Sequence, residues 1–349
     1  MAYLVRILLL IAVLYSGSGV FALNCSQIPS ADIIPGRFIF IPDGASSRTQ
    51  IPPNWDCTYQ ITVPPLIYAT ISLENGLQGY NDVIIVRDEQ GTYTMVSSRS
   101  APTVYFYVFP NTTTTFQVST KSVDMKSSFR LVVYYQRMPN ATVTQMTSSS
   151  LTYFELNDLQ VNSDKLPQTI QALENISLSI AASGYSSDVF DNYFVIDGDF
   201  SQQNAVYRMT SFLSQNYISS GNTLTLVGLD IWNSESSVVL TPLSQTQQFD
   251  SLTSFGVYFN ENQLKIDATT GGRQRKAVTV VSMTNAVVIL GVEMTPPCTS
   301  LKAVSAPLTS SSTVLLDFTA VTDYPRNITE KVFGIIAENC AATLKMMSG

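Results

Sequence analysis

The sequence predicts an all-β protein, and three observations support that prediction. Thr, Val, Ile, Tyr and Phe, which favour strands, are abundant together with Ser, while helix-favouring Glu and Lys are scarce. Only 13% of the residues are charged. Short runs that alternate polar and apolar residues are separated by Pro, Gly and Asn. We therefore expect short antiparallel strands stacked as β-sandwiches.

The N-terminus has the features of a secretion signal. Arg6 precedes an apolar run at 7–14, and residues 20–22 supply the compact side chains of a cleavage site. The run is shorter than the roughly 20 residues that cross a bilayer. We expect residues 1–22 to be a signal peptide and the mature protein to be secreted and extracellular. An uncleaved anchor is the alternative.

The rest of the chain shows no feature of a membrane or nucleic-acid protein. The apolar stretch 277–292 is rich in valine and contains Ser282, Thr284 and Asn285, which favours buried strands over a membrane helix. The net charge is −7 and no basic run is sustained. Nucleic acid and membrane insertion are therefore not expected.

The first strands are most clearly marked between residues 55 and 91. Residues 59–63 alternate polar and apolar side chains up to the break at Pro64 and Pro65. A second strand follows at 69–73, and 83–86 is a short apolar run before a polar turn. Further strands are expected at 37–41, 104–108, 115–119 and 129–135.

This stretch resembles a known family. The pattern C-x-Y-x-I, then I-x-L-E, then Y-x-D, which begins at Cys57, resembles the centre of a CUB domain, a secreted antiparallel β-sandwich of jelly-roll type. It is most similar to the divergent CUB-like domains of secreted nematode proteins, many of which are associated with responses to bacterial infection. The resemblance covers about residues 24–137, so we place CUB-like domain 1 at 23–137.

A weaker copy of the same pattern follows a polar segment at 138–150, which we interpret as a linker. Ile176 to Leu178 matches Ile71 to Leu73, and Asp191 to Gly198 matches Asp82 to Glu89. This predicts tandem modules, with CUB-like domain 2 at 151–245; chance similarity is the alternative. The region 246–349 is rich in strand signals and is either a separate module or an extension of domain 2.

The four cysteines fit an oxidising compartment and allow three pairings. Their spacing favours Cys25–Cys57 and Cys298–Cys340, and the resemblance places Cys25 and Cys57 at the first CUB disulfide. Reactive or metal-binding thiols are the alternative. Glycosylation is expected at the acceptor sequons, which begin at Asn24, Asn111, Asn140, Asn175 and Asn327.

The sequence gives little support for a catalytic site. Histidine is absent, which removes Ser-His-Asp and Cys-His arrangements and histidine zinc sites. Asp197 with Asp199, or Asp88 with Glu89, could be a carboxylate pair, but glycoside hydrolysis needs two carboxyls that converge at about 5–10 Å. We interpret these residues as turn formers and expect no enzyme activity, with an acidic hydrolase as the alternative.

Calcium is the one cofactor that the resemblance raises. Many CUB domains hold Ca²⁺ through a Glu and two Asp residues, and Glu74 and Asp82 match the first two positions. The third falls near Lys121, where no carboxylate stands. Because Ca²⁺ takes six to eight oxygen ligands, we expect no cofactor and prefer an ion pair between Glu74 and Lys121.

Two smaller features have two interpretations each. The basic cluster 273–276 is a processing site or, as we prefer, the solvated flank of a hairpin after Gly271 and Gly272. Trp55 and Trp232 could stack on sugars, although Trp55 is expected to pack near the Cys57 disulfide.

The expected function is recognition. The resemblance implies a non-catalytic binding protein in innate immune or epithelial responses to bacteria. Its partner would be an extracellular protein or glycan, including a bacterial surface. Sandwiches bind through their end loops, so Glu74 to Tyr80 and Ser183 to Asp188 are the candidate contacts. An acidic hydrolase and an extracellular structural or matrix component are the alternatives.

Overall fold

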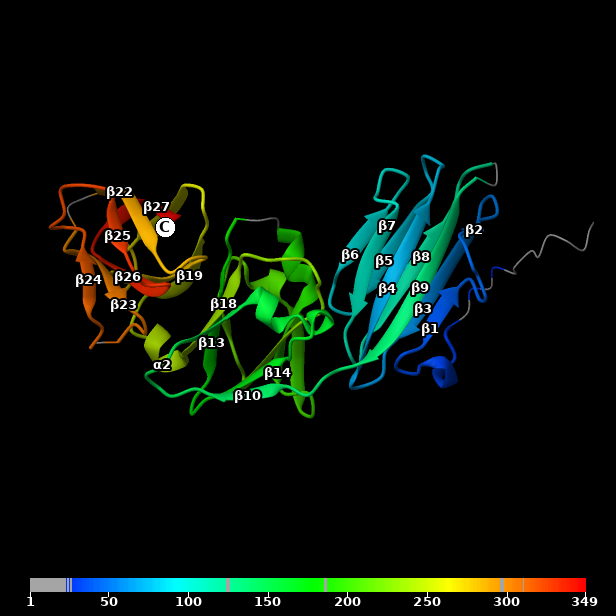
Figure 1. The fold of residues 1–349 in the computed structure, drawn as a ribbon, viewed down its shortest axis with the longest axis horizontal. Coiled ribbons are helices and arrows are strands. Elements are labelled where there is room, and N and C mark those ends of the chain that lie inside the picture. The colour runs from blue at the N-terminus through cyan, green and yellow to red at the C-terminus, as the bar shows by residue number, and fades with distance from the viewer. Residues whose placement is uncertain are drawn as a thin grey trace, which may run out of the picture. The chain divides into compact units, whose positions relative to one another are not determined.

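A computed structural model describes residues 23, 25, 27–123, 126–184, 187–295, 298–309 and 311–349. The predicted signal peptide and Asn24 lie outside these residues. The chain divides into two compact units, 1–138 and 139–349. Strands make up nearly all of the regular structure, so the all-β prediction is confirmed (Figure 1).

The N-terminal unit is one sandwich of two antiparallel sheets, which we call the N-terminal sandwich. One sheet has the order β1-β9-β4-β7, with β2 on β9, and the other has β3-β8-β5-β6. Its strands are β1 (Phe38–Ile41), β2 (Thr49–Gln50), β3 (Asp56–Thr62), β4 (Ile67–Gly76), β5 (Val83–Asp88), β6 (Tyr93–Val96), β7 (Thr103–Val108), β8 (Thr113–Ser119) and β9 (Ser128–Arg137). A short 3-10 turn, η1 (Ser30–Asp32), precedes them.

Alternation along each strand builds the core of this sandwich. In β4, Ala69, Ile71 and Leu73 are fully buried, while Thr70 and Ser72 point to the other face. Apolar side chains from the facing sheet complete the core, among them Tyr59, Ile61, Ile84 and Phe116. Period-two burial of this kind is what fixes the register of a sheet with one buried face.

The C-terminal unit contains two more sandwiches, and we call the first the middle sandwich. Its sheets have the orders β10-β12-β17-β14-β15 and β11-β18-β13-β16. The strands are β10 (Thr142–Gln145), β11 (Thr152–Glu155), β12 (Gln168–Gln171), β13 (Ile176–Ala181), β14 (Tyr193–Gly198), β15 (Gln203–Arg208), β16 (Tyr217–Ile218), β17 (Thr223–Gly228) and β18 (Ser237–Pro242). The 3-10 turns are η2 (Leu156–Leu159), η3 (Val161–Ser163), η4 (Ser187–Asn192) and η5 (Met209–Phe212).

The segment predicted as a linker is partly a strand. Within 138–150, β10 pairs in parallel with β12 from Thr142 to Gln145. The alternation signal is missing because β10 is a short edge strand whose one apolar residue, Val143, is 54% exposed.

The remaining strands form the C-terminal sandwich, which follows the helix α2 (Leu243–Thr246). Its sheets have the orders β19-β21-β26-β23-β24 and β20-β27-β22-β25. The strands are β19 (Ser251–Val257), β20 (Asn262–Asp267), β21 (Arg275–Ser282), β22 (Val287–Thr295), β23 (Ser300–Ser305), β24 (Val314–Asp317), β25 (Arg326–Ile328), β26 (Val332–Glu338) and β27 (Ala341–Ser348).

The three sandwiches share one strand order. The sheet β1-β9-β4-β7 corresponds to β11-β18-β13-β16 and then to β20-β27-β22-β25. The sheet β3-β8-β5-β6 likewise corresponds to β12-β17-β14-β15 and to β21-β26-β23-β24. In both later sandwiches one extra strand, β10 or β19, pairs in parallel with the first strand of the second sheet. Residues 246–349 therefore contain the complete strand set of a third sandwich.

One disulfide lies in the N-terminal sandwich and one in the C-terminal sandwich. Cys25 is bonded to Cys57 in β3, and Cys298 to Cys340 beside β27, which is the pairing that the sequence favours. In the chain-entropy model, closing loops of this length stabilises the fold by about 3–4 kcal/mol each. The middle sandwich contains none of the four cysteines.

Candidate binding site at the end loops of the N-terminal sandwich

Glu74 lies on β4, opposite Arg130 of β9. Its carboxylate forms an ion pair with the Arg130 guanidinium, which also donates to the carbonyl oxygen of Ser46. Glu74 pairs with Arg130 and not with the expected Lys121, because the β4–β9 register places Arg130 directly opposite Glu74. Glu74 thus helps to hold the loop before β2 against the sheet.

Asp82 has a different environment, because its side chain is fully buried against the loop that connects β8 to β9. Its carboxylate accepts hydrogen bonds from the backbone N–H of Lys121 (2.7 Å) and Ser122 (3.0 Å). The hydroxyls of Ser122 (2.7 Å) and Ser127 (2.5 Å) donate to its second oxygen. Asp82 therefore joins the loop before β5 to the loop before β9.

These contacts determine the charge state of Asp82. Desolvation raises the pKa of the carboxyl, but the hydrogen bonds from the Ser127 and Ser122 hydroxyls and from the N–H groups of Lys121 and Ser122 outweigh it. The pKa of Asp82 consequently lies below its ordinary value. The buried group is a carboxylate, which stabilises the loops through charge-assisted hydrogen bonds.

Gly79 is required for this arrangement. A Cβ atom at position 79 would lie 2.2 Å from the Asp82 Oδ2 atom. The Ser127 hydroxyl oxygen also accepts hydrogen bonds from the N–H groups of Gln78 (2.9 Å) and Gly79 (3.3 Å). Asp82, Ser127 and Gly79 thus lock two end loops into one rigid base.

Exposed side chains of three kinds lie on or beside this base. Tyr80 is 84% exposed and Val123 is 89% exposed. The Arg99 guanidinium, from the loop between β6 and β7, lies 6.0 Å from the centroid of the Tyr80 ring. We call Tyr80, Arg99 and Val123 the loop tip. It combines Tyr and Arg, two residue types that are enriched in binding hot spots, with an exposed apolar side chain.

The sequence identified only one member of the loop tip. Tyr80 lies in the predicted loop 74–80, whereas Arg99 and Val123 come from other loops. No periodicity or spacing links those segments, so only the folded sheet order brings them together.

The corresponding loop of the middle sandwich is built differently. Ser183 is buried, and its N–H donates to the Ser236 hydroxyl at 3.1 Å. Residues 185 and 186 of the predicted contact segment Ser183 to Asp188 lie outside the described part of the chain. Asp191, at the position that matches Asp82, is half-buried at the end of η4.

Metal-binding groups do not gather in the described residues, where no cluster of three or more His, Cys, Asp or Glu side chains is placed to hold an ion. Glu74 and Asp82, the calcium candidates, each have the protein partners given above. The expectation of no calcium at this pair stays a prediction.

The acidic residues considered for hydrolysis stabilise turns. Asp88 accepts from the N–H groups of Gln90 and Thr92. Asp199 accepts from the hydroxyl of Ser201 and from backbone N–H groups, which lower its pKa. Asp197 instead accepts from the Tyr217 hydroxyl at 2.6 Å; burial, and then this carboxylate, raise the pKa of Tyr217.

The basic cluster is not a hairpin flank, because β20 and β21 belong to different sheets. The N–H groups of Arg273 and Arg275 donate to Asp250, which holds the turn. Arg275 also forms an ion pair with Glu338 at 2.9 Å. The peptide bonds after Arg275 lie within a strand paired on both sides, by β19 and β26.

The two tryptophans differ in exposure. Trp55 is half-buried and packs on the N-terminal core, to which Cys57 also belongs. Trp232 is 62% exposed in the loop after β17. Only Trp232 has a side chain largely open to solvent.

Among the predicted glycosylation sites, Asn111, Asn140 and Asn327 are exposed. Asn175 is half-buried, and its side-chain amide donates to the Ser219 carbonyl oxygen at 2.7 Å. The first three are therefore the more accessible acceptors.

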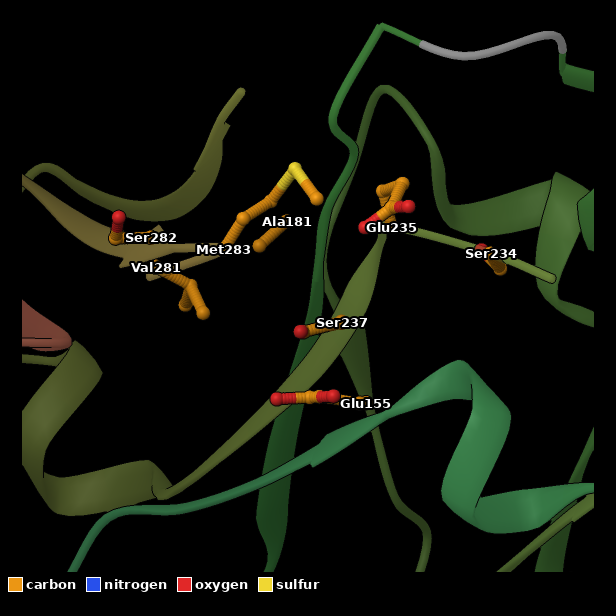
Figure 2. A pocket seen from close by; sticks show the side chains of 8 residues that line it. All are labelled: Glu155, Ala181, Ser234, Glu235, Ser237, Val281, Ser282 and Met283. Carbon is orange, nitrogen blue, oxygen red and sulfur yellow. The ribbon is translucent and has the colours of Figure 1, made fainter. Parts of the chain in front are cut away.

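Two hollows lie where the middle and C-terminal sandwiches meet. The smaller, shown in Figure 2, has a volume of about 30 Å³, room for a water molecule. It is lined by Glu155, Ala181, Ser234, Glu235, Ser237, Val281, Ser282 and Met283. The larger is an open groove of about 590 Å³ beside α2, lined in part by Ile218, Phe249, Asp250 and Arg273. The Asp250 carboxylate in this groove already accepts hydrogen bonds from the backbone N–H groups of Arg273 and Arg275.

Comparison with known proteins identifies the class of the N-terminal sandwich. Residues 21–139 match the family model of the CUB-like domain. The chain therefore contains a CUB-like domain, and CUB domains are typically non-catalytic modules that mediate protein interactions. A search of curated proteins finds no match.

Similar solved structures include the CUB1-EGF-CUB2 domains of rat MASP-1, at 9% identity over 62% of this chain and 100% of that chain, with a TM-score of 0.25. The corresponding domains of human MASP-1/3 give 10% identity over 58% and 98%, with a TM-score of 0.22. Tripeptidyl peptidase 2 gives 9% over 86% and 26%, with a TM-score of 0.25. The assignment rests on the family match.

The compartment is consistent with this class. Two disulfides and a CUB-like domain fit an extracellular protein. Within the described residues, no helix has the length and apolar character needed to span a bilayer.

Proposed function

We propose that this is a secreted, non-catalytic recognition protein of the nematode CUB-like type, active in innate immune or epithelial responses to bacteria. Its three sandwiches would be diverged copies of one module. The loop tip of the N-terminal sandwich makes the primary contact with an extracellular protein or glycan, including one on a bacterial surface. The observation that carries this proposal is that exposed Tyr80 and Val123 lie on loops held by buried Asp82, with the Arg99 guanidinium over the Tyr80 ring.

Rigidity supports a binding role. Loops that are ordered before a partner binds lose little conformational entropy on binding, and this raises the affinity. Asp82 and Ser127 supply that order through buried hydrogen bonds. A cation beside an aromatic ring offers a partner both a π-face and a donor.

Binding should not need calcium. The Asp82 oxygens are already bonded to loop donors, and Glu74 is paired with Arg130. Removing divalent ions should therefore leave both the loops and their affinity unchanged.

The test is a screen of the full mature chain against glycans and intact bacterial surfaces, with calcium and with a chelator. Tyr80→Ala should weaken a detected interaction by about tenfold or more. Tyr93→Ala is the matched control, because Tyr93 is 59% exposed on β6 but lies outside the loop tip. Absence of binding in every condition, or equal binding by both variants, would contradict the proposal.

A further inference from the structure

The middle and C-terminal sandwiches meet along the outer face of β13. There the Ser179 hydroxyl lies 2.6 Å from the Ser254 hydroxyl of β19, and Ala181 packs against Val281 of β21. Two residues before Ser179, on the same face of the strand, Ser177 lines the open groove of about 590 Å³ beside α2. The groove, which we call the α2 groove, therefore begins where the contact between the two sandwiches ends.

Hydrogen-bonding side chains dominate the lining of the α2 groove. Asn216, Thr246, Gln247 and Ser251 contribute amides and hydroxyls, and one carboxylate and one guanidinium accompany them. The volume of the groove lies within the range of about 300–1,000 Å³ that is usual for sites of small ligands. A ligand that fits here must therefore offer several hydrogen-bond donors and acceptors.

Ser177 contributes a buried hydroxyl to the α2 groove. The residue is only 3% exposed, and its hydroxyl forms no hydrogen bond with the described residues. Ser179, on the same face, has the Ser254 hydroxyl as its partner. Because buried polar groups are normally hydrogen-bonded, the Ser177 hydroxyl needs a partner that a ligand in the groove can supply.

One wall of the α2 groove, at β16, is tied to the C-terminal sandwich. The side-chain amide of Asn216, just before β16, donates to the carbonyl oxygen of Leu252 in β19. The Asn216 amide oxygen takes no part in that bond and can accept from a ligand. Ile218 of β16 is 51% exposed and adds an apolar surface. This wall therefore offers an acceptor next to an apolar contact.

The two charged residues that line the α2 groove, Asp250 and Arg273, have opposite signs. The Asp250 carboxylate is fixed by the backbone N–H groups of Arg273 and Arg275, and it has further lone pairs for a ligand. The Arg273 guanidinium donates to the carbonyl oxygen of Phe249 at 3.4 Å, which uses one of its five N–H donors. Because the two charges balance, the groove favours a neutral ligand over an ion.

An uncharged saccharide matches this set of groups. Each sugar hydroxyl is both a donor and an acceptor, so neighbouring hydroxyls can bond to the Asp250 carboxylate and to the Arg273 guanidinium. The C–H groups of the sugar ring can pack on Ile218. An apolar ligand would instead cover the polar side chains and leave them without partners, which is unfavourable. Because the groove is open, a longer sugar chain can continue beyond it.

We propose that the α2 groove binds an uncharged oligosaccharide. The Arg273 guanidinium and the Ser177 hydroxyl bond to sugar hydroxyls, the Asp250 carboxylate accepts from them, and Ile218 packs on the ring. This site is separate from the loop tip, which lies in the other unit of the chain. The proposal therefore does not depend on what the loop tip binds.

Saturation-transfer difference NMR of the full mature chain tests the proposal, with maltotriose, cellotriose, mannotriose and chitotriose as probes. At least one should bind with a Kd below about 1 mM. Arg273→Gln should raise that Kd about tenfold or more, because it removes charge-assisted bonds while the backbone N–H to Asp250 remains. Ser177→Ala should raise it about three- to tenfold. Arg326→Gln, on exposed β25 of the other sheet, is the matched control and should leave it unchanged.

Two further probes and one further variant identify the ligand class and the site. Trigalacturonic acid and an uncharged Gly-Ser hexapeptide should each bind at least about tenfold more weakly than the best neutral trisaccharide. Tyr80→Ala should bind that trisaccharide as the wild type does, which separates the α2 groove from the loop tip. The proposal is overturned if no trisaccharide binds, if the acid or the peptide binds more tightly, if both groove substitutions leave the Kd unchanged, or if Tyr80→Ala raises it.

Discussion

The sheets β1-β9-β4-β7 and β11-β18-β13-β16 have the same strand order but differ on their outer faces. In the middle sandwich this face carries Ser177, Ser179 and Ala181, all buried. In the N-terminal sandwich, Phe38 and Phe40 on the equivalent face remain open to solvent. The inward-facing residues maintain the fold in both, so the outward-facing residues decide what each copy contacts.

The two sandwiches also differ in how their loops are held. The N-terminal sandwich has a disulfide at Cys57 and the buried carboxylate of Asp82. The middle sandwich has no cysteine, and it is stabilised on one face by its neighbour. The two sandwiches therefore differ in the contacts that stabilise them. Substitutions in one sandwich, with the other as the control, test this difference.

The largest effect is expected from the disulfides. Cys25→Ser with Cys57→Ser should destabilise the N-terminal sandwich by about 3–4 kcal/mol, because the unfolded chain regains the freedom of a closed loop. Denaturant unfolding followed by Trp55 fluorescence in a Trp232→Phe background reports this unit. The middle sandwich, followed through Trp232 in a Trp55→Phe background, should be unaffected. Equal losses at both tryptophans would contradict the independent roles of the two units.

The next effect concerns the buried aspartate. Asp82→Asn should destabilise the N-terminal sandwich by about 2–3 kcal/mol, because an amide leaves some of the four donors to Asp82 without an acceptor. Asp191→Asn, at the matching but half-buried position, should change stability by less than about 0.5 kcal/mol. The same fluorescence assay measures both. A similar loss for the two variants would show that Asp82 has no special role.

The interface of the middle sandwich should be sensitive to a single methyl group. Gly256→Ala should cost about 1–2 kcal/mol, because the Ala182 carbonyl oxygen occupies the space that Cβ needs. Gly291→Ala is the control, since a Cβ there meets nothing within 4 Å. Calorimetry should show the C-terminal unit melting earlier in the first variant alone. An unchanged melting temperature would place the contact elsewhere.

The smallest effect is a dependence on pH. The pKa of Asp82 is lowered in the folded state, so its contribution is complete above the ordinary aspartate pKa of about 3.9 and is lost as the pH falls through the folded value. Stability of the N-terminal sandwich should therefore fall below about pH 4 in the wild type. Asp82→Asn should show a shallower decline. Parallel pH profiles would mean that other carboxylates control acid unfolding.

The sequence predicted the strands well where alternation is strong. Residues 59–63, 69–73 and 83–86 all overlap strands, because each places apolar side chains on one buried face. The strand β10 escaped prediction because an edge strand with a single apolar residue has no period. The similarity of 176–198 indicated a second copy, whereas the third copy is seen only in its strand order.

The candidate site was less accessible to sequence reasoning. Asp82 was identified as a metal ligand candidate by its position, although in the fold its carboxylate binds two backbone N–H groups and two hydroxyls. Glu74 was assigned Lys121 as its partner, whereas the register supplies Arg130. Both outcomes depend on contacts between segments more than 35 residues apart, since Lys121 and Ser122 lie 39 and 40 residues from Asp82. Local patterns do not encode such distances.

Hydroxyl-radical footprinting tests most directly whether the equivalent outer faces of the N-terminal and middle sandwiches differ in solvent exposure. Phe38, Phe40 and Tyr105 should be oxidised, because their side chains are exposed. Tyr153, which packs at the interface of the middle sandwich, should be protected. Protection of all four residues, or oxidation of all four, would contradict the account.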